Sequence, residues 1–197
     1  EYTIYVKGTN PNYENEATTT AILKITQRPV TFTGKSETKV YTGETITINT
    51  VEVTATAEGV GLVSEHTHNV EFSASGTEAG TYTGTITAKA NVVIKSGETD
   101  VTANYDITVE NGTLTIEKTD AKFEISLDND EYVYDAAEHA NANTAESTAA
   151  TGTTTYSYSF EENGEYVSDL SSLKKVNAGE YTIYVKGTNP NYENEAT

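Results

Sequence analysis

The sequence opens on the stretch Glu1-Tyr-Thr-Ile-Tyr-Val-Lys-Gly-Thr-Asn-Pro-Asn-Tyr-Glu-Asn-Glu-Ala-Thr18, which returns letter for letter as Glu180 to Thr197. The two copies lie 179 residues apart (180 − 1), and eighteen consecutive identities do not arise by chance. This repeat indicates that the chain is a window of a longer tandem array. Arrays of small units are typically extended scaffolds, so we expect the function to lie in architecture rather than in catalysis.

The composition excludes several classes of partner. The 197 residues carry a formal net charge of −18. Nucleic acids and anionic membranes attract clustered Lys and Arg, so neither is an expected partner. Because the chain has no Cys, it can form no disulfide, thiol nucleophile or thiolate metal site. No run approaches the roughly 20 apolar residues of a membrane-spanning helix, and we expect no membrane insertion.

Alternating hydrophobicity predicts an all-β chain. Apolar residues make up 36 % of the sequence, below the usual value of about 45–50 %, so we expect small domains with thin cores. Only 168–175 suits a short helical turn. The period-2 patterns that predict strands lie at 2–6, 21–25, 30–32, 47–56, 70–73, 82–88, 105–109, 114–116, 123–127, 132–134 and 156–160, and again at 181–185, the second copy of 2–6.

Two features set the predicted domain boundaries. Pro29 follows a strand directly, and since proline is excluded from central ladder positions, we place a junction near Gln27-Arg28. Asn111-Gly112 favours a type I′ hairpin, because both central residues of that turn need a positive φ. The predicted parts are the closing strands of a preceding repeat (1–26), a complete domain (27–117, the first segment) and a domain lacking its last strand (118–197, the second segment).

The two segments resemble each other. Val40-Tyr41-Thr42-Gly43 corresponds to Val133-Tyr134-Asp135-Ala136 at an offset of 93, and Ala79–Tyr82 corresponds to Ala178–Tyr181 at an offset of 99. Short strands in related domains of about ninety residues favour two tandem immunoglobulin-like β-sandwiches. Tyr82 and Tyr181 are candidates for the tyrosine corner of that fold, whose hydroxyl bonds back to upstream backbone; the alternative is an ordinary strand tyrosine after a turn.

These motifs resemble a known family. Its pattern is carried by Tyr41-Thr42-Gly43, by Asn104-Tyr105 with Asn111–Ile116, and by Asn177–Lys186 with Asn191-Tyr192. Together they resemble the tandem MBG/YDG-type repeats of large bacterial surface proteins and adhesins, over essentially the whole chain. The resemblance implies an immunoglobulin-like stalk module, exported and anchored at the bacterial cell surface, with no catalytic or ligand-binding residue set. The second segment departs from the pattern at Ala136, where glycine is usual.

Candidate chemical sites are few. His66-Thr67-His68 places two imidazoles on one face of a strand and can suit a metal, but a polar surface loop is the favoured interpretation. Asp128-Asn129-Asp130-Glu131 offers oxygen ligands of the kind Ca²⁺ uses, against a solvated turn. Lys24 and Lys122 are candidates for an isopeptide bond if buried. We assign no catalytic, metal or cofactor-binding residue, expect no cofactor and do not expect an enzyme.

The sequence leaves three functions open. The favoured one is a structural stalk or spacer of a bacterial cell-surface protein, with neighbouring repeats of the same protein as partners. A second is an adhesive module that binds host glycan, mucin or matrix protein through Tyr5, Tyr184 and the Tyr13/Tyr192 loop. A third is a filament subunit, in which residues 1–26 complete the second segment of an adjacent molecule by strand exchange.

Overall fold

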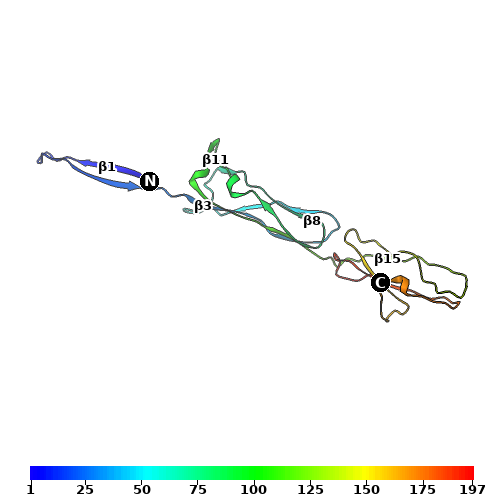
Figure 1. The fold of residues 1–197 in the computed structure, drawn as a ribbon. Coiled ribbons are helices and arrows are strands. Elements are labelled where there is room, and N and C mark those ends of the chain that lie inside the picture. Colours follow the sequence, from blue (N-terminus) through cyan, green and yellow to red (C-terminus); the bar gives the residue numbers. More distant parts are fainter. The chain divides into compact units, whose positions relative to one another are not determined.

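The computed structural model describes all 197 residues, and the chain is all-β, as predicted (Figure 1). Eighteen short strands form seven small sheets of two or three strands each. The remaining regular structure is three 3-10 turns: η1 (Lys89–Asn91), η2 (Thr102–Asn104) and η3 (Leu170–Ser172). The turn η3 lies inside 168–175, where the sequence indicated one. None of these turns has the length or apolar character needed to cross a lipid bilayer.

Backbone contacts divide the chain into two compact units, and these do not follow the order of the sequence. The first unit comprises Glu1–Thr33, Val51–Glu71 and Ile86–Glu110. The second comprises Gly34–Thr50, Phe72–Thr85 and Asn111–Thr197, so it unites part of the first segment with all of the second.

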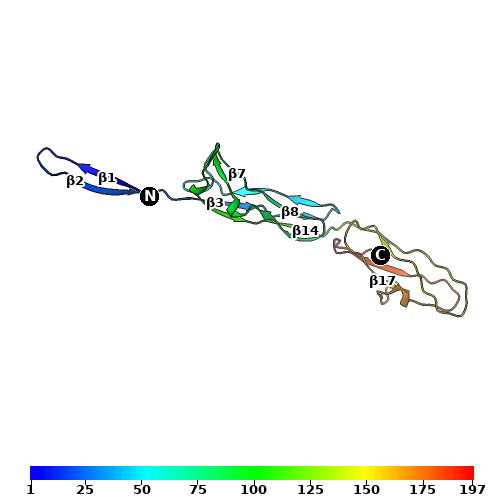
Figure 2. The ribbon, with the colours of Figure 1, turned by 45° about the horizontal axis from the view of Figure 1, so that its top comes forward.

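Strands β1 (Tyr2–Gly8) and β2 (Ala17–Leu23) form an antiparallel hairpin of their own (Figure 2). Its register pairs Tyr2 with Leu23 and Gly8 with Ala17. The strand β2 begins four residues before the predicted one, because the β-branched threonines ahead of Ala21 also suit a ladder. Every residue from 1 to 27 is exposed, so the hairpin has no buried core and is held by its ladder and by an exposed ion pair between Lys7 and Glu16.

The first sheet of the first segment has the order β13-β3-β6. Its members are β3 (Arg28–Gly34), β6 (Val51–Val53) and β13 (Tyr105–Glu110), with β13 parallel to β3. Pro29 lies inside the central strand β3, contrary to the rule by which it marked a junction. Proline is tolerated there because it is the second residue of the strand. It precedes Thr31, whose O accepts the hydrogen bond from Thr54 N on the side of β6.

One apolar core belongs to this region. Val30 and Phe32 of β3 point into it together with Tyr105 and Ile107 of β13, as the alternating pattern predicts. The sheet with the order β12-β11-β7 adds Ile94 to the core. The members of that sheet are β7 (His66–His68), β11 (Ile94–Ser96) and β12 (Thr99–Asp100).

A third sheet has the order β4-β14-β9, with β14 in the centre. Strand β14 (Thr113–Glu117) is parallel to β4 (Glu37–Val40) and antiparallel to β9 (Gly80–Thr83). Its Leu114 and Ile116 are 0 % and 2 % exposed. The neighbouring sheet β10-β8-β5 contains β5 (Ile46–Ile48), β8 (Phe72–Gly76) and β10 (Thr85–Ile86), so the single strand expected over 47–56 is two strands, β5 and β6.

The hairpin predicted at Asn111-Gly112 is wrong. Strands β13 and β14 flank this dipeptide but lie in different sheets, and neither residue has a positive φ. Gly112 is required for another reason: a Cβ there would collide with the carbonyl oxygen of Gly34. The O of Gly112 also accepts a hydrogen bond from Gly84 N at 2.9 Å. The dipeptide is thus a close backbone crossing between sheets.

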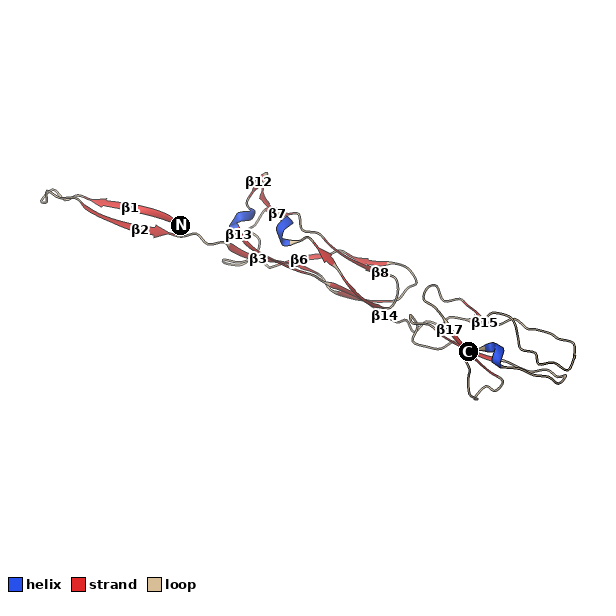
Figure 3. Cartoon of the chain, viewed as in Figure 1, coloured by secondary structure: helices blue, strands red, loops and turns tan.

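The second segment has little regular structure (Figure 3). Its strands pair two by two: β15 (Ile125–Ser126) with β16 (Glu146–Ser147), and β17 (Thr155–Ser159) with β18 (Tyr184–Thr188). The strand predicted over 132–134 does not form.

Candidate functional site

The most highly organised polar site lies in the loop that follows β18, where Asn189 and Asn191 are buried. The Asn191 side chain is 0 % exposed. Its Oδ1 accepts a hydrogen bond from Ala79 N at 2.7 Å, and its Nδ2 donates to Thr151 O at 3.2 Å. One amide therefore connects the chain ahead of β9 with the loop ahead of β17. We call Asn189, Asn191 and the groups that they bind the asparagine junction.

Asn189 completes the junction. Its Nδ2 donates to the carbonyl oxygens of Thr151 and Gly152 at 3.1 and 3.2 Å, and its Oδ1 accepts from Asn191 N at 3.0 Å. Gly152 has a φ of +79°, and a Cβ there would lie 2.7 Å from Asn191 Nδ2. Glycine is required at this position both for its left-handed backbone and for the space.

Backbone bonds close the same region. Thr119 N donates to Asn191 O at 3.0 Å, and Glu193 N donates to Thr119 O at 2.9 Å. These two bonds hold the start of the second segment against its end.

Aromatic rings cover the junction. The ring of Tyr192 lies 5.6 Å from that of Tyr41 and 4.7 Å from that of Phe123. Tyr41 is 5 % exposed, and its hydroxyl lies 2.9 Å from Thr151 Oγ1 and accepts from Thr151 N at 3.1 Å. Because Tyr41 belongs to the first segment and the others to the second, these contacts join the two segments within one compact unit.

The duplicated sequence supplies an internal comparison. In the first copy, Asn12 N donates to Asn10 Oδ1 at 2.9 Å and Tyr13 N donates to Asn10 O at 2.9 Å, as the equivalent residues of the junction do at 3.0 and 3.1 Å. Yet Asn10, Asn12 and Tyr13 are all exposed. The turn is therefore encoded locally, whereas its burial depends on the partners around residues 79 and 151.

The junction suits a mechanical role. Its groups are neutral amides, hydroxyls and backbone, with no acid, base or nucleophile pair at its centre. No buried side-chain nitrogen or oxygen in the chain lacks a hydrogen-bond partner. Satisfied buried networks fix one geometry, because any alternative arrangement leaves polar groups unpaired.

The histidine pair lies in strand β7, not in a surface loop as favoured from the sequence. The His66 ring contacts the Tyr105 hydroxyl through Nδ1 at 2.7 Å, and the His68 ring packs 4.8 Å from Phe32. Val70 N donates to His68 Nδ1, and burial lowers the pKa of His68. Both imidazoles thus serve packing. The chain contains no group of three or more His, Cys, Asp or Glu side chains placed to hold a metal ion.

In the acidic turn at 128–131, the carboxylate of Asp130 already accepts hydrogen bonds from the protein itself. Asp130 accepts from Ala142 N and from the Tyr132 hydroxyl, and these bonds, the first above all, lower the pKa of its carboxyl group. The two isopeptide candidates, Lys24 and Lys122, are both exposed, so neither has the burial that such a bond requires.

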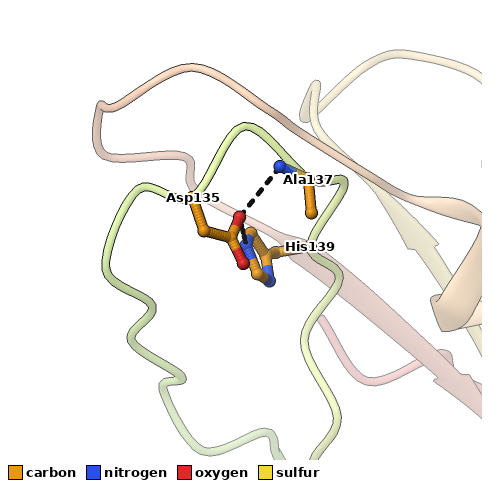
Figure 4. Close-up of polar contacts among 3 residues, drawn as sticks. All are labelled: Asp135, Ala137 and His139. Atoms are coloured by element: carbon orange, nitrogen blue, oxygen red, sulfur yellow. Dashed lines mark hydrogen bonds and ion pairs between the residues drawn. The ribbon is translucent and has the colours of Figure 1, made fainter.

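The turn at 135–139 shows how the second segment accommodates its missing glycine (Figure 4). Asp135 Oδ1 accepts from Ala137 N and from His139 Nε2, each at 2.8 Å, and the Ala137 bond is the main cause of its lowered pKa. Ala136 has a φ of +64°, close to the +83° of Gly43 at the equivalent position. Alanine therefore adopts the glycine conformation at some cost in strain.

The six tyrosines named as candidates from the sequence fall into three groups. The hydroxyl of Tyr82 donates to Glu78 O at 2.8 Å and that of Tyr181 to Asn177 O at 2.9 Å, which is the geometry expected of a tyrosine corner. Among the glycan-binding candidates, Tyr184 and Tyr192 are half-buried. Tyr5 and Tyr13 are 82 % and 75 % exposed.

Comparison with known proteins identifies one part of the chain. The family model of the MBG domain matches residues 28–118. The match is consistent with an MBG-type repeat over that range, as the sequence motifs indicated. No curated protein and no solved structure matched the chain.

Proposed function

We propose that the chain is a stalk segment of a bacterial cell-surface protein, in which tandem immunoglobulin-like β-sandwich modules hold a distal binding domain away from the cell envelope. The MBG match at 28–118 supports a repeat domain of surface proteins. The duplication of residues 1–18 at 180–197 supports a longer array. A net charge of −18 keeps such an array soluble and favours extension, because its modules repel one another.

The asparagine junction is the observation that carries this proposal. A spacer transmits length only if successive modules do not bend freely at each connection. Here Tyr41 of the first segment and Asn191 of the second are buried in one shared network rather than separated by an exposed linker. Short connections with satisfied hydrogen bonds limit bending.

Distance measurements between the two segments test the proposal. The chain has no Cys, so Thr47→Cys and Glu165→Cys introduce two unique, exposed sites for spin labels. We expect a narrow distribution of distances, which Asn191→Ala broadens and Asn12→Ala leaves unchanged. A broad distribution in the parent chain would refute a stiff connection and with it the spacer role.

A second candidate function is an adhesive module. The exposed rings of Tyr5 and Tyr13 are amphipathic surfaces of the kind that stack on sugars. Saturable binding to mucin, matrix protein or a glycan panel at physiological salt, lost in Tyr5→Ala or Tyr13→Ala, would favour this function. Absence of binding would leave the stalk as the favoured function.

A further inference from the structure

Strand β7 lies at the edge of its sheet and has β11 as its neighbour (Figure 2). In that antiparallel ladder His68 pairs with Ile94 and His66 with Ser96. Because side chains alternate along a strand, the two imidazoles share one face and Thr67 lies on the other. Their face meets the aromatic rings of β3 and β13. The attachment of β7 therefore rests on a three-residue ladder and on these two side chains.

Both imidazoles use Nδ1 as a hydrogen-bond acceptor. Val70 N donates to His68 Nδ1 at 3.2 Å, so this ring nitrogen carries no hydrogen. The Tyr105 hydroxyl accepts from Val63 N at 3.1 Å and lies 2.7 Å from His66 Nδ1. Tyr105 is 4 % exposed, so its hydroxyl hydrogen needs an acceptor within the protein, and His66 Nδ1 supplies it. Each ring is thus neutral, with its hydrogen on Nε2.

Protonation would turn both acceptors into donors. An imidazolium carries a hydrogen on each ring nitrogen, so Nδ1 no longer accepts from Val70 N or from the Tyr105 hydroxyl. Both donors then lack their partner in a buried region, which costs free energy in the closed arrangement. Burial acts in the same direction, because it lowers the pKa of His68.

The neighbouring sheet places no carboxylate on the face that carries the imidazoles. Lys95 of β11 pairs with Thr67 on one side and with Asp100 of β12 on the other, so all three lie on the opposite face. Glu65 and Glu71 flank β7 in the sequence, and both are exposed. The other charged residues of the elements around this core are also exposed: Glu52 of β6, Lys89 of η1, and Asp106 and Glu110 of β13. None of these groups replaces the bonds that protonation removes.

The remaining charge, Arg28 of β3, holds the loop that precedes β7. Its Nε donates to Gly61 O at 2.7 Å, and its Nη2 donates to Ala57 O at 2.6 Å. A guanidinium stays protonated at every pH at which histidine titrates, so these bonds persist while the imidazoles change. Residues 57–61 are therefore fixed independently of pH, and a movement of β7 would begin after Gly61.

The segment between Gly61 and β7 contains a strained residue. Glu65 has a φ of +66°, a left-handed conformation that is unfavourable for a residue with a Cβ. The bond from His66 N to Val63 O at 3.1 Å closes the turn around it. Strained backbone persists only while its surroundings hold it, so loss of the histidine contacts also removes support from this turn.

We propose that His66 and His68 form an acid-operated latch. When both imidazoles gain a proton, residues 62–70 leave Phe32 and Tyr105, while β3, β13 and the loop held by Arg28 stay folded. The closed segment holds both rings neutral and the open segment binds both protons, so a falling pH favours the open form. Histidine in water gains its proton near about pH 6.5, so the latch is closed at neutral pH and weakens below it. Opening uncovers Phe32, which is 0 % exposed in the closed form.

Hydrogen exchange of the intact chain, followed by NMR, tests this proposal. Each result is expressed as a protection factor, which removes the intrinsic pH dependence of exchange. Uptake of one to two protons on opening should lower the protection of the Val63 and Val70 amides by about ten- to a hundredfold between pH 7.5 and pH 5.5. The amides of Ile107 and Val109 in β13 should keep theirs. Unchanged protection in the latch, or an equal loss in β13, overturns the proposal.

Substitution by asparagine separates the acceptor from the proton. The amide oxygen of Asn lies near the position of Nδ1 and accepts a hydrogen bond, but the side chain does not titrate. A chain with His66→Asn and His68→Asn should therefore keep its protection at pH 5.5. His139→Asn is the matched control, since it removes the third histidine, and it should respond to acid like the parent. Acid opening of the double variant contradicts the latch.

The ring nitrogens of the parent chain provide a test without any substitution in the latch. Nitrogen chemical shifts distinguish a protonated from an unprotonated ring nitrogen, and His139→Asn leaves only the two latch histidines to assign. At pH 7.5 both should carry hydrogen on Nε2 and none on Nδ1. A hydrogen on Nδ1 of either ring at that pH would refute the acceptor role on which the latch depends.

Discussion

Replacing Asn191 with alanine is expected to lower the free energy of unfolding by about 2–4 kcal/mol. The substitution removes the acceptor of Ala79 N and the donor to Thr151 O. The Asn191 side chain is fully buried, so water does not replace either bond without structural change. Leaving Ala79 N without its partner costs about 1–3 kcal/mol, whereas Thr151 O keeps the bond from Asn189 Nδ2 and loses one hydrogen bond, worth about 0.5–1.5 kcal/mol; together these give about the range stated.

The repeat provides a control for the same substitution. Asn12→Ala changes the equivalent residue of the first copy, where the flanking residues are the same but the side chain is exposed. A surface substitution of this kind should change the unfolding free energy by no more than about 0.5 kcal/mol. The comparison therefore isolates tertiary contacts from local turn propensity.

Urea denaturation measures both variants. Circular dichroism reports on the strands, and the fluorescence of the 14 tyrosines serves because the chain has no Trp. In a chain of this size a loss of 3 kcal/mol also corresponds to a decrease in Tm of about 6–12 °C. Equal effects of Asn191→Ala and Asn12→Ala would refute the reasoning, because the buried network would then contribute nothing beyond the turn.

Three smaller perturbations follow from single residues. Ala136→Gly should stabilise the chain by about 1 kcal/mol in urea denaturation, since it relieves a φ of +64°; no gain would mean that the strain is already relaxed. Burial lowers the pKa of His68 in the folded state, so the unfolded state binds the proton first, and stability should decrease as pH falls below the ordinary value of 6.5. His68→Asn should reduce that slope, and an unchanged slope would assign it to another group. Tyr82→Phe and Tyr181→Phe each remove one hydroxyl bond to backbone and should cost about 0.5–1.5 kcal/mol by thermal denaturation; no loss in either variant would mean that these bonds contribute nothing to stability.

Features that depend on neighbouring residues could be predicted from the sequence. The all-β class follows from alternation, and the bonds of Tyr82 and Tyr181 reach only four residues upstream. The turn η3 is also local, because Asp169 accepts from Ser171 N within it. In each case the residues that determine the geometry lie within one turn of chain.

Features set by long-range pairing could not be predicted from the sequence. Asn111-Gly112 has the local signal of a hairpin, but parallel pairing of β13 with β3 and of β14 with β4 draws the flanking strands into different sheets. The polar run His66-Thr67-His68 suggested a loop, yet its two imidazoles pack beside Phe32 and Tyr105, which are distant in sequence.

The asparagine junction shows the same limit most directly. Asn10 and Asn189 accept the same local bonds in the same eighteen residues, yet one is exposed and the other buried. No pattern within those residues separates the two outcomes. The available signal was the duplication itself, because it shows that the same eighteen residues occur in two different environments.

Strand formation in this chain therefore depends on the neighbour as much as on the residues. Tyr2-Thr3-Ile4 is a strand because β2 lies opposite, and Tyr181-Thr182-Ile183 is not because no such strand does. In a repeat array each unit contributes part of its stability through the interface with the next, so a unit without its partner strand is incompletely ordered. In this chain the asparagine junction is such a connection. In the proposed stalk, each repeat would therefore resist bending and extension only together with its neighbours.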